Sequence, residues 1–150
     1  MSNTITTRSL GKPVCIVTGG SYGIGDAVCE KFIDQGYAVI NLDIKANPTQ
    51  SKAIGWLKCD VSVSSEVSQA IEQTIKQHGR VDCLVSNAGI HFSATIEDTS
   101  EEDFERVFGL NVKGAIAATK AVLPQMKSQQ NGVILYMASD QALIAKHNSF

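Results

Sequence analysis

Residues 18–25 read TGGSYGIG, and this glycine-rich stretch joins an apolar run, VCIV (14–17), to a segment with helical periodicity, DAVCEKFIDQG (26–36). A tight turn explains one or two glycines, because glycine reaches positive φ values that other residues avoid. Four glycines in eight residues indicate in addition that a ligand approaches the backbone closely. The N-terminus of a helix offers unpaired N–H groups and a partial positive charge, so the sequence predicts an anion, such as a phosphate, at this turn.

The composition limits the kind of protein. The 150 residues carry a formal net charge of −2 without a basic stripe, so a small molecule is the expected partner rather than nucleic acid or an anionic membrane. The apolar runs are far shorter than the ~20 residues of a membrane span, and the first residues lack a secretory signal. The length suits one domain, residues 1–150. Four cysteines beside apolar runs, without metal-ligand spacing, predict buried free thiols, a cytoplasmic location and no metal site.

Short apolar runs alternate with longer amphipathic ones along the chain. The expected strands cover residues 14–19, 37–43, 53–60, 81–89 and 132–139, and the expected helices cover 24–35, 61–79, 97–111 and 110–127. Thr99 or Ser100 is the expected cap of the third helix, and Pro124 is expected to kink or end the fourth. This alternation predicts a doubly wound α/β domain with a mainly parallel sheet and right-handed crossovers.

Small or polar residues follow every expected strand. They are Gly19 and Ser21, Asp43, Asp60, Asn87 and Ser139. In a doubly wound sheet, ligands bind beyond the carboxyl ends of the strands. Solvent exposure of a strand end explains each residue singly, but it explains the whole set less well. The pattern therefore predicts a functional site at this edge of the sheet.

Asp43 lies eighteen residues after Gly25, at the end of the second expected strand. A carboxylate at this position accepts hydrogen bonds from the adenosine ribose hydroxyls and repels a 2′-phosphate, which favours NAD over NADP. Lys45 weakens this preference slightly, and a solvated surface aspartate is the alternative interpretation. The glycine spacing is T-G-x-x-x-G-x-G, and its position between a strand and a helix is the context that supports a dinucleotide site.

Several motifs, in order, resemble those of the short-chain dehydrogenase/reductase family over residues 12–139. They are TGGSYGIG, CDV at 59–61, SNAG at 86–89, Asn111 in NVKG, and Ser139. Ser86 and Ala138 replace an asparagine and a serine that are common in the family. The resemblance implies a Rossmann-type three-layer α/β/α fold, with about five strands present, and hydride transfer between NAD(H) and an alcohol or carbonyl substrate.

The resemblance also implies the site residues. The implied cofactor contacts come from the glycine turn and the later strand ends: Thr18, Gly19, Ser21, Tyr22, Gly23, Ile24, Gly25, Asp43, Asp60, Val61, Asn87, Ala88 and Gly89. Asp60 is expected to meet the adenine. Ser139 is expected to hydrogen-bond the substrate, and Asn111 to hold a water or a helix distortion that serves proton transfer. From the residues alone, Ser139 also fits an ordinary polar strand end and Asn111 a helix-interior asparagine.

The family's Tyr-x-x-x-Lys pair, expected about thirteen residues after the serine, is missing. Tyr22, Tyr37 and Tyr136 are the only tyrosines, and none has Lys four residues later. The sequence therefore predicts a C-terminally truncated chain that lacks the later strands, leaves its fifth strand as an open edge, and is inactive alone.

A second class of function remains open: a non-catalytic NAD-binding or self-association module derived from the same family. The helix at 111–127 is rich in small residues, including Gly114 and Ala118. It resembles the helix through which family members form dimers and tetramers, so a homo-oligomer is expected. Packing against the sheet is the simpler account of these small residues.

Overall fold

The computed structural model describes residues 11–144 of the chain. Its strands are β1 (Val14–Thr18), β2 (Ala38–Asp43), β3 (Ile54–Lys58), β4 (Cys83–Ser86) and β5 (Val133–Tyr136). Its helices are α1 (Gly23–Asp34), α2 (Ser64–His78), α3 (Glu101–Phe108) and α4 (Ala115–Gln129). A π-helical turn, η1 (Gly109–Gly114), joins α3 to α4, and a 3-10 turn, η2 (Asp140–Ala142), follows β5.

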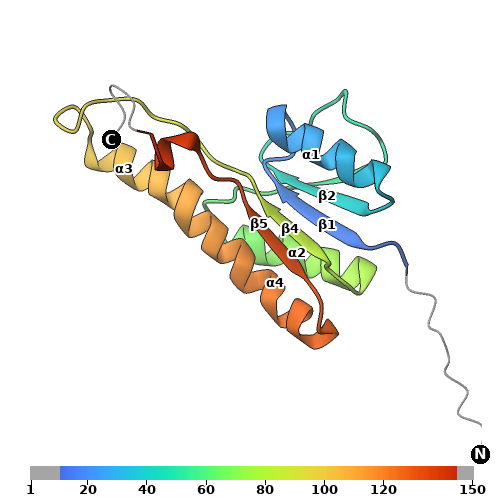
Figure 1. Ribbon diagram of the computed structural model, residues 1–150. Coiled ribbons are helices and arrows are strands. Elements are labelled where there is room, and N and C mark those ends of the chain that lie inside the picture. The colour runs from blue at the N-terminus through green and yellow to red at the C-terminus, as the bar shows by residue number, and fades with distance from the viewer. Residues whose placement is uncertain (1–10, 145–150) are drawn as a thin grey trace, which may run out of the picture.

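The strands form one parallel sheet in the order β3-β2-β1-β4-β5. Helix α1 covers one face of the sheet, and α2 and α4 cover the other (Figure 1). The strand order reverses at β1, which pairs with β2 on one side and with β4 on the other. This arrangement confirms the predicted fold class, a Rossmann-type three-layer α/β/α domain.

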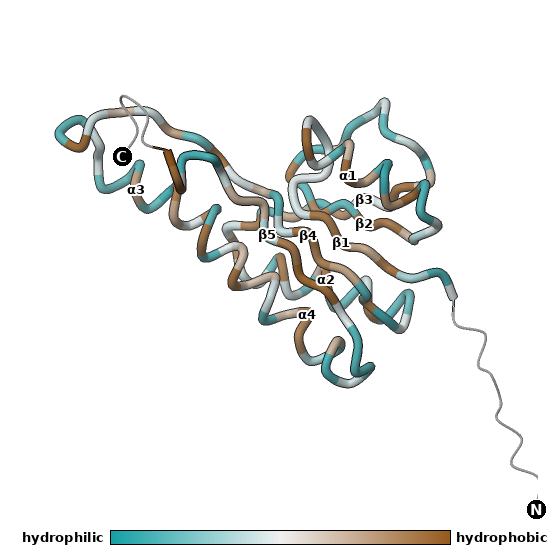
Figure 2. The backbone as a smooth tube through the Cα atoms, in the orientation of Figure 1, coloured by the Kyte–Doolittle hydropathy of each residue, from teal (hydrophilic) through white to brown (hydrophobic). Residues whose placement is uncertain are grey.

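Strand β1 is buried on both faces, which is why its sequence reads as a continuous apolar run rather than an alternating one. Cys15 and Val17 pack with Cys29 of α1 on one face. Ile16 packs with Ile71 of α2 on the other face. Figure 2 shows the hydrophobic colour concentrated in the central strands, with hydrophilic segments along the helices and loops around them. The core therefore fixes the carboxyl ends of the strands as one rigid edge.

Two helix starts are set by side chains that bond to the backbone. The helix predicted at 61–79 begins only at Ser64, because Asp60 accepts hydrogen bonds from the N–H and the hydroxyl of Ser62 at 2.9 and 2.6 Å and forms a turn instead. Of the two predicted caps for α3, Ser100 takes the role: its hydroxyl accepts the N–H of Asp103 at 3.1 Å.

The predicted helices at 97–111 and 110–127 form one continuous rod of α3, η1 and α4, interrupted by the π-helical turn. Pro124 lies inside α4, which continues to Gln129, so it does not end the helix. The helix ends where Gln130 adopts a left-handed conformation, with φ of 53°.

Strand β5 forms one edge of the sheet in the part of the chain that the structure describes. The side chains of Val133, Leu135 and Tyr136 are about half exposed there. The expectation that the fifth strand presents an apolar edge is confirmed. An edge of this kind pairs readily with another chain.

Candidate functional site

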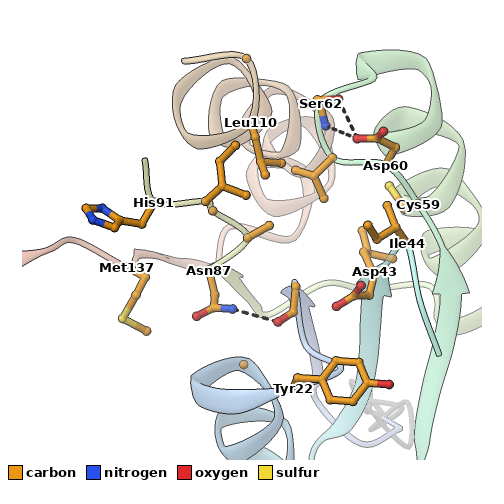
Figure 3. A pocket seen from close by; sticks show the side chains of 18 of the residues that line it. Tyr22, Asp43, Ile44, Cys59, Asp60, Ser62, Asn87, His91, Leu110 and Met137 are labelled. Carbon is orange, nitrogen blue, oxygen red and sulfur yellow. Dashed lines mark hydrogen bonds between the residues drawn. The ribbon is translucent and has the colours of Figure 1, made fainter. Parts of the chain in front are cut away.

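A cavity of about 900 Å³ lies at the carboxyl ends of the strands, where the strand order reverses. Its walls come from the glycine turn, from the ends of β2, β3 and β4, from the α3–η1 region and from the segment after β5. Figure 3 shows Tyr22 and Asp43 on one side of this cavity and Asp60 and Leu110 on another. Asn87 and His91 line the remaining side. The predicted edge of the sheet is thus a single concave site.

The glycine turn is packed too tightly for side chains at three positions, Gly19, Gly20 and Gly25. A Cβ on Gly20 would come within 2.7 Å of the Asn41 Oδ1. A Cβ on Gly19, which has φ of +65°, would come within 2.9 Å of the Ala88 Cα. A Cβ on Gly25 would overlap the carbonyl oxygen of Gly19 and approach the Asn87 Nδ2 to 2.7 Å. Helix α1 begins at Gly23, within this turn, and its N-cap residue Tyr22 makes no side-chain cap bond. Its first N–H groups are therefore available to an anion.

Asp43 is held in place by two backbone donors. Its Oδ2 accepts the N–H of Ser21 at 3.1 Å, and its Oδ1 accepts the N–H of Lys45 at 3.1 Å. A carboxylate has about four acceptor positions, so both oxygens retain capacity for further donors. The half-buried carboxylate lines the cavity beside the exposed Ile44. This geometry suits a pair of vicinal hydroxyls.

The end of β3 supplies Asp60 and Val61 to a second part of the cavity, beside Cys59. The two hydrogen bonds from Ser62 fix the Asp60 side chain through its Oδ1. Burial, together with repulsion from Glu66 and Asp60, raises the pKa of the Cys59 thiol to about 11. Cys59 is therefore protonated near neutral pH and acts as a packing residue rather than a nucleophile.

Asn87 and Thr18 join the ends of β4 and β1. The Thr18 Oγ1 accepts the N–H groups of Asn87 and Ala88, both at 3.0 Å, and the Asn87 Nδ2 donates to the carbonyl oxygens of Thr18 and Gly19. These bonds take the chain out of the sheet after Ser86, so the strand predicted at 81–89 is shorter than expected. They also hold the floor of the cavity in one conformation.

Asn111 lies in η1, and its carboxamide binds the backbone of Ile90 twice. The Oδ1 accepts the N–H of Ile90 and the Nδ2 donates to its carbonyl oxygen, both at 2.9 Å. Asn111 thus ties the loop after β4 to a helix distortion. Ser139 follows β5, where its hydroxyl accepts the N–H of Gln141 at 3.2 Å and donates to Asp140 Oδ1 at the same distance.

Most of the predicted site residues come together at the cavity. Those that line it are Gly19, Tyr22, Ile24, Gly25, Asp43, Asp60, Val61, Asn87, Ala88, Gly89 and Ser139. Thr18, Ser21, Gly23 and Asn111 are not among its lining residues. The Ser21 side chain is fully buried and donates its hydroxyl proton to the carbonyl oxygen of Lys45.

Sequence reasoning missed three carboxamides that bind the glycine turn: Asn41 in β2, and Asn47 and Gln50 in the following loop. Asn41 is fully buried, with an exposed fraction of 0%. An asparagine inside an otherwise apolar strand was the signal that could have identified it, because buried polar groups have hydrogen-bond partners. Gln50 carries no such signal.

Within residues 11–144, no helix is long and apolar enough to cross a membrane. The same residues contain no group of three or more His, Cys, Asp or Glu side chains arranged to hold a metal ion. All four cysteines are free and buried.

Comparison with known proteins shows what this chain is similar to. The family model for short chain dehydrogenase matches residues 13–149. The chain is 35% identical to (+)-borneol dehydrogenase 1 of Salvia officinalis over 146 residues, which are 92% of this chain and 56% of that protein. The chain spans about half the length of the curated relatives it matches.

Solved structures agree with the sequence comparison. The ligand-free aldohexose dehydrogenase of Thermoplasma acidophilum has a TM-score of 0.87 at 36% identity, over 93% of this chain and 54% of that one. The 3-ketoacyl-(acyl-carrier-protein) reductase of Brucella melitensis, complexed with NADH, has a TM-score of 0.84 at 31% identity, over 94% and 63%. A further similar structure, ElxO, has NADP bound. The closely packed glycines of the turn, the free helix N-terminus and the anchored carboxylate fit a nicotinamide dinucleotide.

Proposed function

The chain belongs to the short-chain dehydrogenase family, and from this premise we propose that residues 1–150 form a single NAD-binding Rossmann domain of an oxidoreductase. The reaction is hydride transfer between NAD(H) and a small alcohol or carbonyl substrate. The observation that carries the proposal is the turn at 18–25, where a Cβ on Gly25 would overlap the Gly19 carbonyl oxygen beside an uncapped helix N-terminus. When bound, the nicotinamide supplies the hydride chemistry.

Each part of the cavity then has a role in holding the dinucleotide. The first N–H groups of α1 bind the pyrophosphate, Asp43 binds the adenosine ribose, and Asp60 and Val61 enclose the adenine. Asn87, Ala88 and Gly89 hold the floor of the cavity toward the nicotinamide. The family binds nicotinamide cofactors, and we assign NAD rather than NADP because Asp43 presents a negative charge where a 2′-phosphate would lie.

The first test of the cofactor site is the Asp43→Ala variant. Loss of the ribose contacts is expected to raise the Kd for NADH about tenfold, while the Kd for NADPH stays the same or falls because the repulsion is removed. Titration of each nucleotide followed by tryptophan and nicotinamide fluorescence measures both constants. Asp34→Ala, at the opposite end of α1, is the control and should bind NADH like the original chain. Equal Kd values for NADH in all three proteins would contradict the assignment.

Two residues carry the roles closest to the substrate. Ser139 lines the same cavity as Asn87, which supports its role as the group that hydrogen-bonds the substrate oxygen. Asn111 is a positioning residue: through Ile90 it fixes the loop that follows β4, and it lies in the π-helical turn that the resemblance associates with proton transfer.

A polypeptide of these 150 residues is expected to bind NADH without turning over, because no tyrosine in it has Lys four residues later. A phenol near its reference pKa of about 10 is a poor base at neutral pH, so a tyrosine without its lysine partner is not expected to act as the base. The measurement is NADH formation at 340 nm with NAD and a panel of secondary alcohols. Turnover of any alcohol above the rate without protein would refute this expectation.

The alternative function is a non-catalytic NAD-binding or self-association module. It is favoured by the exposed apolar stripe of Phe104, Phe108, Val112 and Ile116 along α3, η1 and α4. We propose that this stripe and the β5 edge are covered in a homo-oligomer. The four buried free thiols support a reducing compartment, the cytoplasm.

A further inference from the structure

A set of carboxamide side chains that are not among the lining residues of the cavity binds the glycine turn. These side chains come from β2 and from the loop that follows it: Asn41, Asn47 and Gln50. None of them belongs to the motifs that led to the proposed function. Their contacts fall on three consecutive peptide units, those between Gly19 and Tyr22.

The first of these peptide units joins Gly19 to Gly20. Its carbonyl oxygen accepts a hydrogen bond from the Asn87 Nδ2 at 3.0 Å. Its N–H donates to the Oδ1 of Asn41 at 2.9 Å. Asn41 is fully buried, and its Nδ2 donates in turn to the Ser21 hydroxyl at 2.9 Å and to the Gln50 Oε1 at 3.2 Å. The first unit is therefore held at both ends.

The second peptide unit joins Gly20 to Ser21. Its carbonyl oxygen accepts from the Nε2 of Gln50 at 2.6 Å, and its N–H donates to the Asp43 Oδ2 at 3.1 Å. The third unit begins at the Ser21 carbonyl, which accepts from the Nδ2 of Asn47 at 2.7 Å. The Gln50 Nε2 also donates to Asp26 Oδ1 at 2.7 Å and so reaches the first turn of α1.

This arrangement addresses a weakness of any glycine-rich anion site. Glycine allows a peptide unit to rotate at little cost, and a rotated unit points its carbonyl oxygen where its N–H pointed before. In the Gly20–Ser21 unit the N–H holds the Asp43 carboxylate. Rotation of this unit would remove that donor and turn a carbonyl oxygen, which repels a carboxylate, toward Asp43, so the ribose site would be disturbed.

We propose that Gln50 and Asn41 are positioning residues for the cofactor: they lock the Gly20–Ser21 peptide, so that the Ser21 N–H holds the Asp43 carboxylate in place for the ribose. This inference rests on the proposed function. Gln50 acts through the backbone, since it binds the turn and does not line the cavity.

The test uses Gln50→Met, which keeps the length of the side chain and removes its hydrogen bonds. Gln50 is half-buried in a loop, so this variant is expected to fold. The Kd for NADH should rise about fivefold to tenfold, because the three hydrogen bonds of the Gln50 carboxamide are lost. Gln125→Met removes a comparable bond, from its Nε2 to the Gly79 carbonyl oxygen, and should leave the Kd unchanged. Asn41→Leu should act like Gln50→Met, in the same direction.

A double-mutant cycle separates positioning from general loss of stability. If Gln50 acts through Asp43, Gln50→Met should weaken NADH binding much less in an Asp43→Ala background than in the original chain. A purely structural role predicts that Gln50→Met raises the Kd for NADH by the same factor in both backgrounds. Additive effects, or an unchanged Kd in Gln50→Met, would overturn the proposal.

Amide hydrogen exchange on the ligand-free chain gives a readout that does not depend on NADH. The Ser21 amide should exchange roughly tenfold faster in Gln50→Met, while the Val17 amide in β1 keeps its protection. If the original chain fails to bind NADH, the proposed function is wrong. In that case the exchange rate of the Ser21 amide alone decides whether Gln50 locks the Gly20–Ser21 peptide. Unchanged exchange at Ser21 would overturn the proposal in either case.

Discussion

Gly25→Ala is expected to abolish measurable NADH binding, with a rise in Kd of about a hundredfold or more. The added methyl group would overlap the Gly19 carbonyl oxygen, which belongs to the backbone and has no other rotamer. Relief requires the turn to move away from α1, and that movement takes the first N–H groups of the helix away from the pyrophosphate. Fluorescence titration with NADH measures the loss, and far-UV circular dichroism reports whether the fold persists.

Gly11→Ala is the control for this prediction. Gly11 is exposed before β1 and does not line the cavity, and a Cβ there meets nothing within 4 Å. This variant should therefore be about as stable as the original chain, with the same Kd for NADH. A folded Gly25→Ala protein that binds NADH as tightly as Gly11→Ala would show that the turn does not hold the cofactor.

The parts of the fold that follow from local pattern were predictable from the sequence. Strand β1 lies at 14–18 because a continuous apolar run of this length has to be buried on both faces of a parallel sheet. The turn after it was predictable from its glycines, and the five strand ends that carry polar residues do lie at one edge. In a parallel sheet all strands run in the same direction, so their carboxyl ends lie at one edge. The alternation of strands and helices in the sequence therefore predicted where the cavity lies.

Features that depend on contacts distant in sequence were not predictable. The end of β4 at Ser86 follows from bonds between Asn87 and Thr18, which are 69 residues apart. The π-helical turn at 109–114 has no local signature, so the helix distortion at Asn111 was expected only from the family resemblance, and Asn111 binds Ile90 across 21 residues. Gln50 reads as an ordinary polar loop residue until the fold brings it to Gly20. In each case tertiary hydrogen bonds override the local pattern.

Asp82 offers the largest stability effect expected away from the cavity. It lies directly before β4 and is only 8% exposed. Its Oδ2 accepts the N–H of Val14 at 2.8 Å, and Arg80 binds both of its oxygens, at 2.8 and 2.6 Å. The side chain thus joins the start of β1 to the start of β4, and an uncharged replacement leaves the Val14 N–H and the Arg80 guanidinium without their acceptor.

Asp82→Ala should lower the free energy of unfolding by about 3 kcal/mol at neutral pH, since a buried ion pair loses one member. Burial raises the pKa of Asp82, but hydrogen bonds from Arg80 and the Val14 N–H, with the charge of Arg80, outweigh burial and hold the pKa below its ordinary value. The contribution of the carboxylate is therefore complete above the unfolded-state pKa of about 3.9 and is lost as the pH falls through the lower folded-state value.

Urea unfolding of both proteins at a series of pH values measures this effect, and the gap in stability between them should narrow as the pH falls below about 4. Glu105→Ala is the control, because Glu105 pairs with Lys113 at 2.7 Å while both side chains are more than half exposed. That variant should lose no more than about 0.5 kcal/mol at any pH. Two ion pairs of nearly equal length would then differ severalfold in their contribution to the free energy of unfolding. If the loss of stability in Asp82→Ala stays constant down to low pH, the packing of Asp82 rather than its charge stabilises the fold.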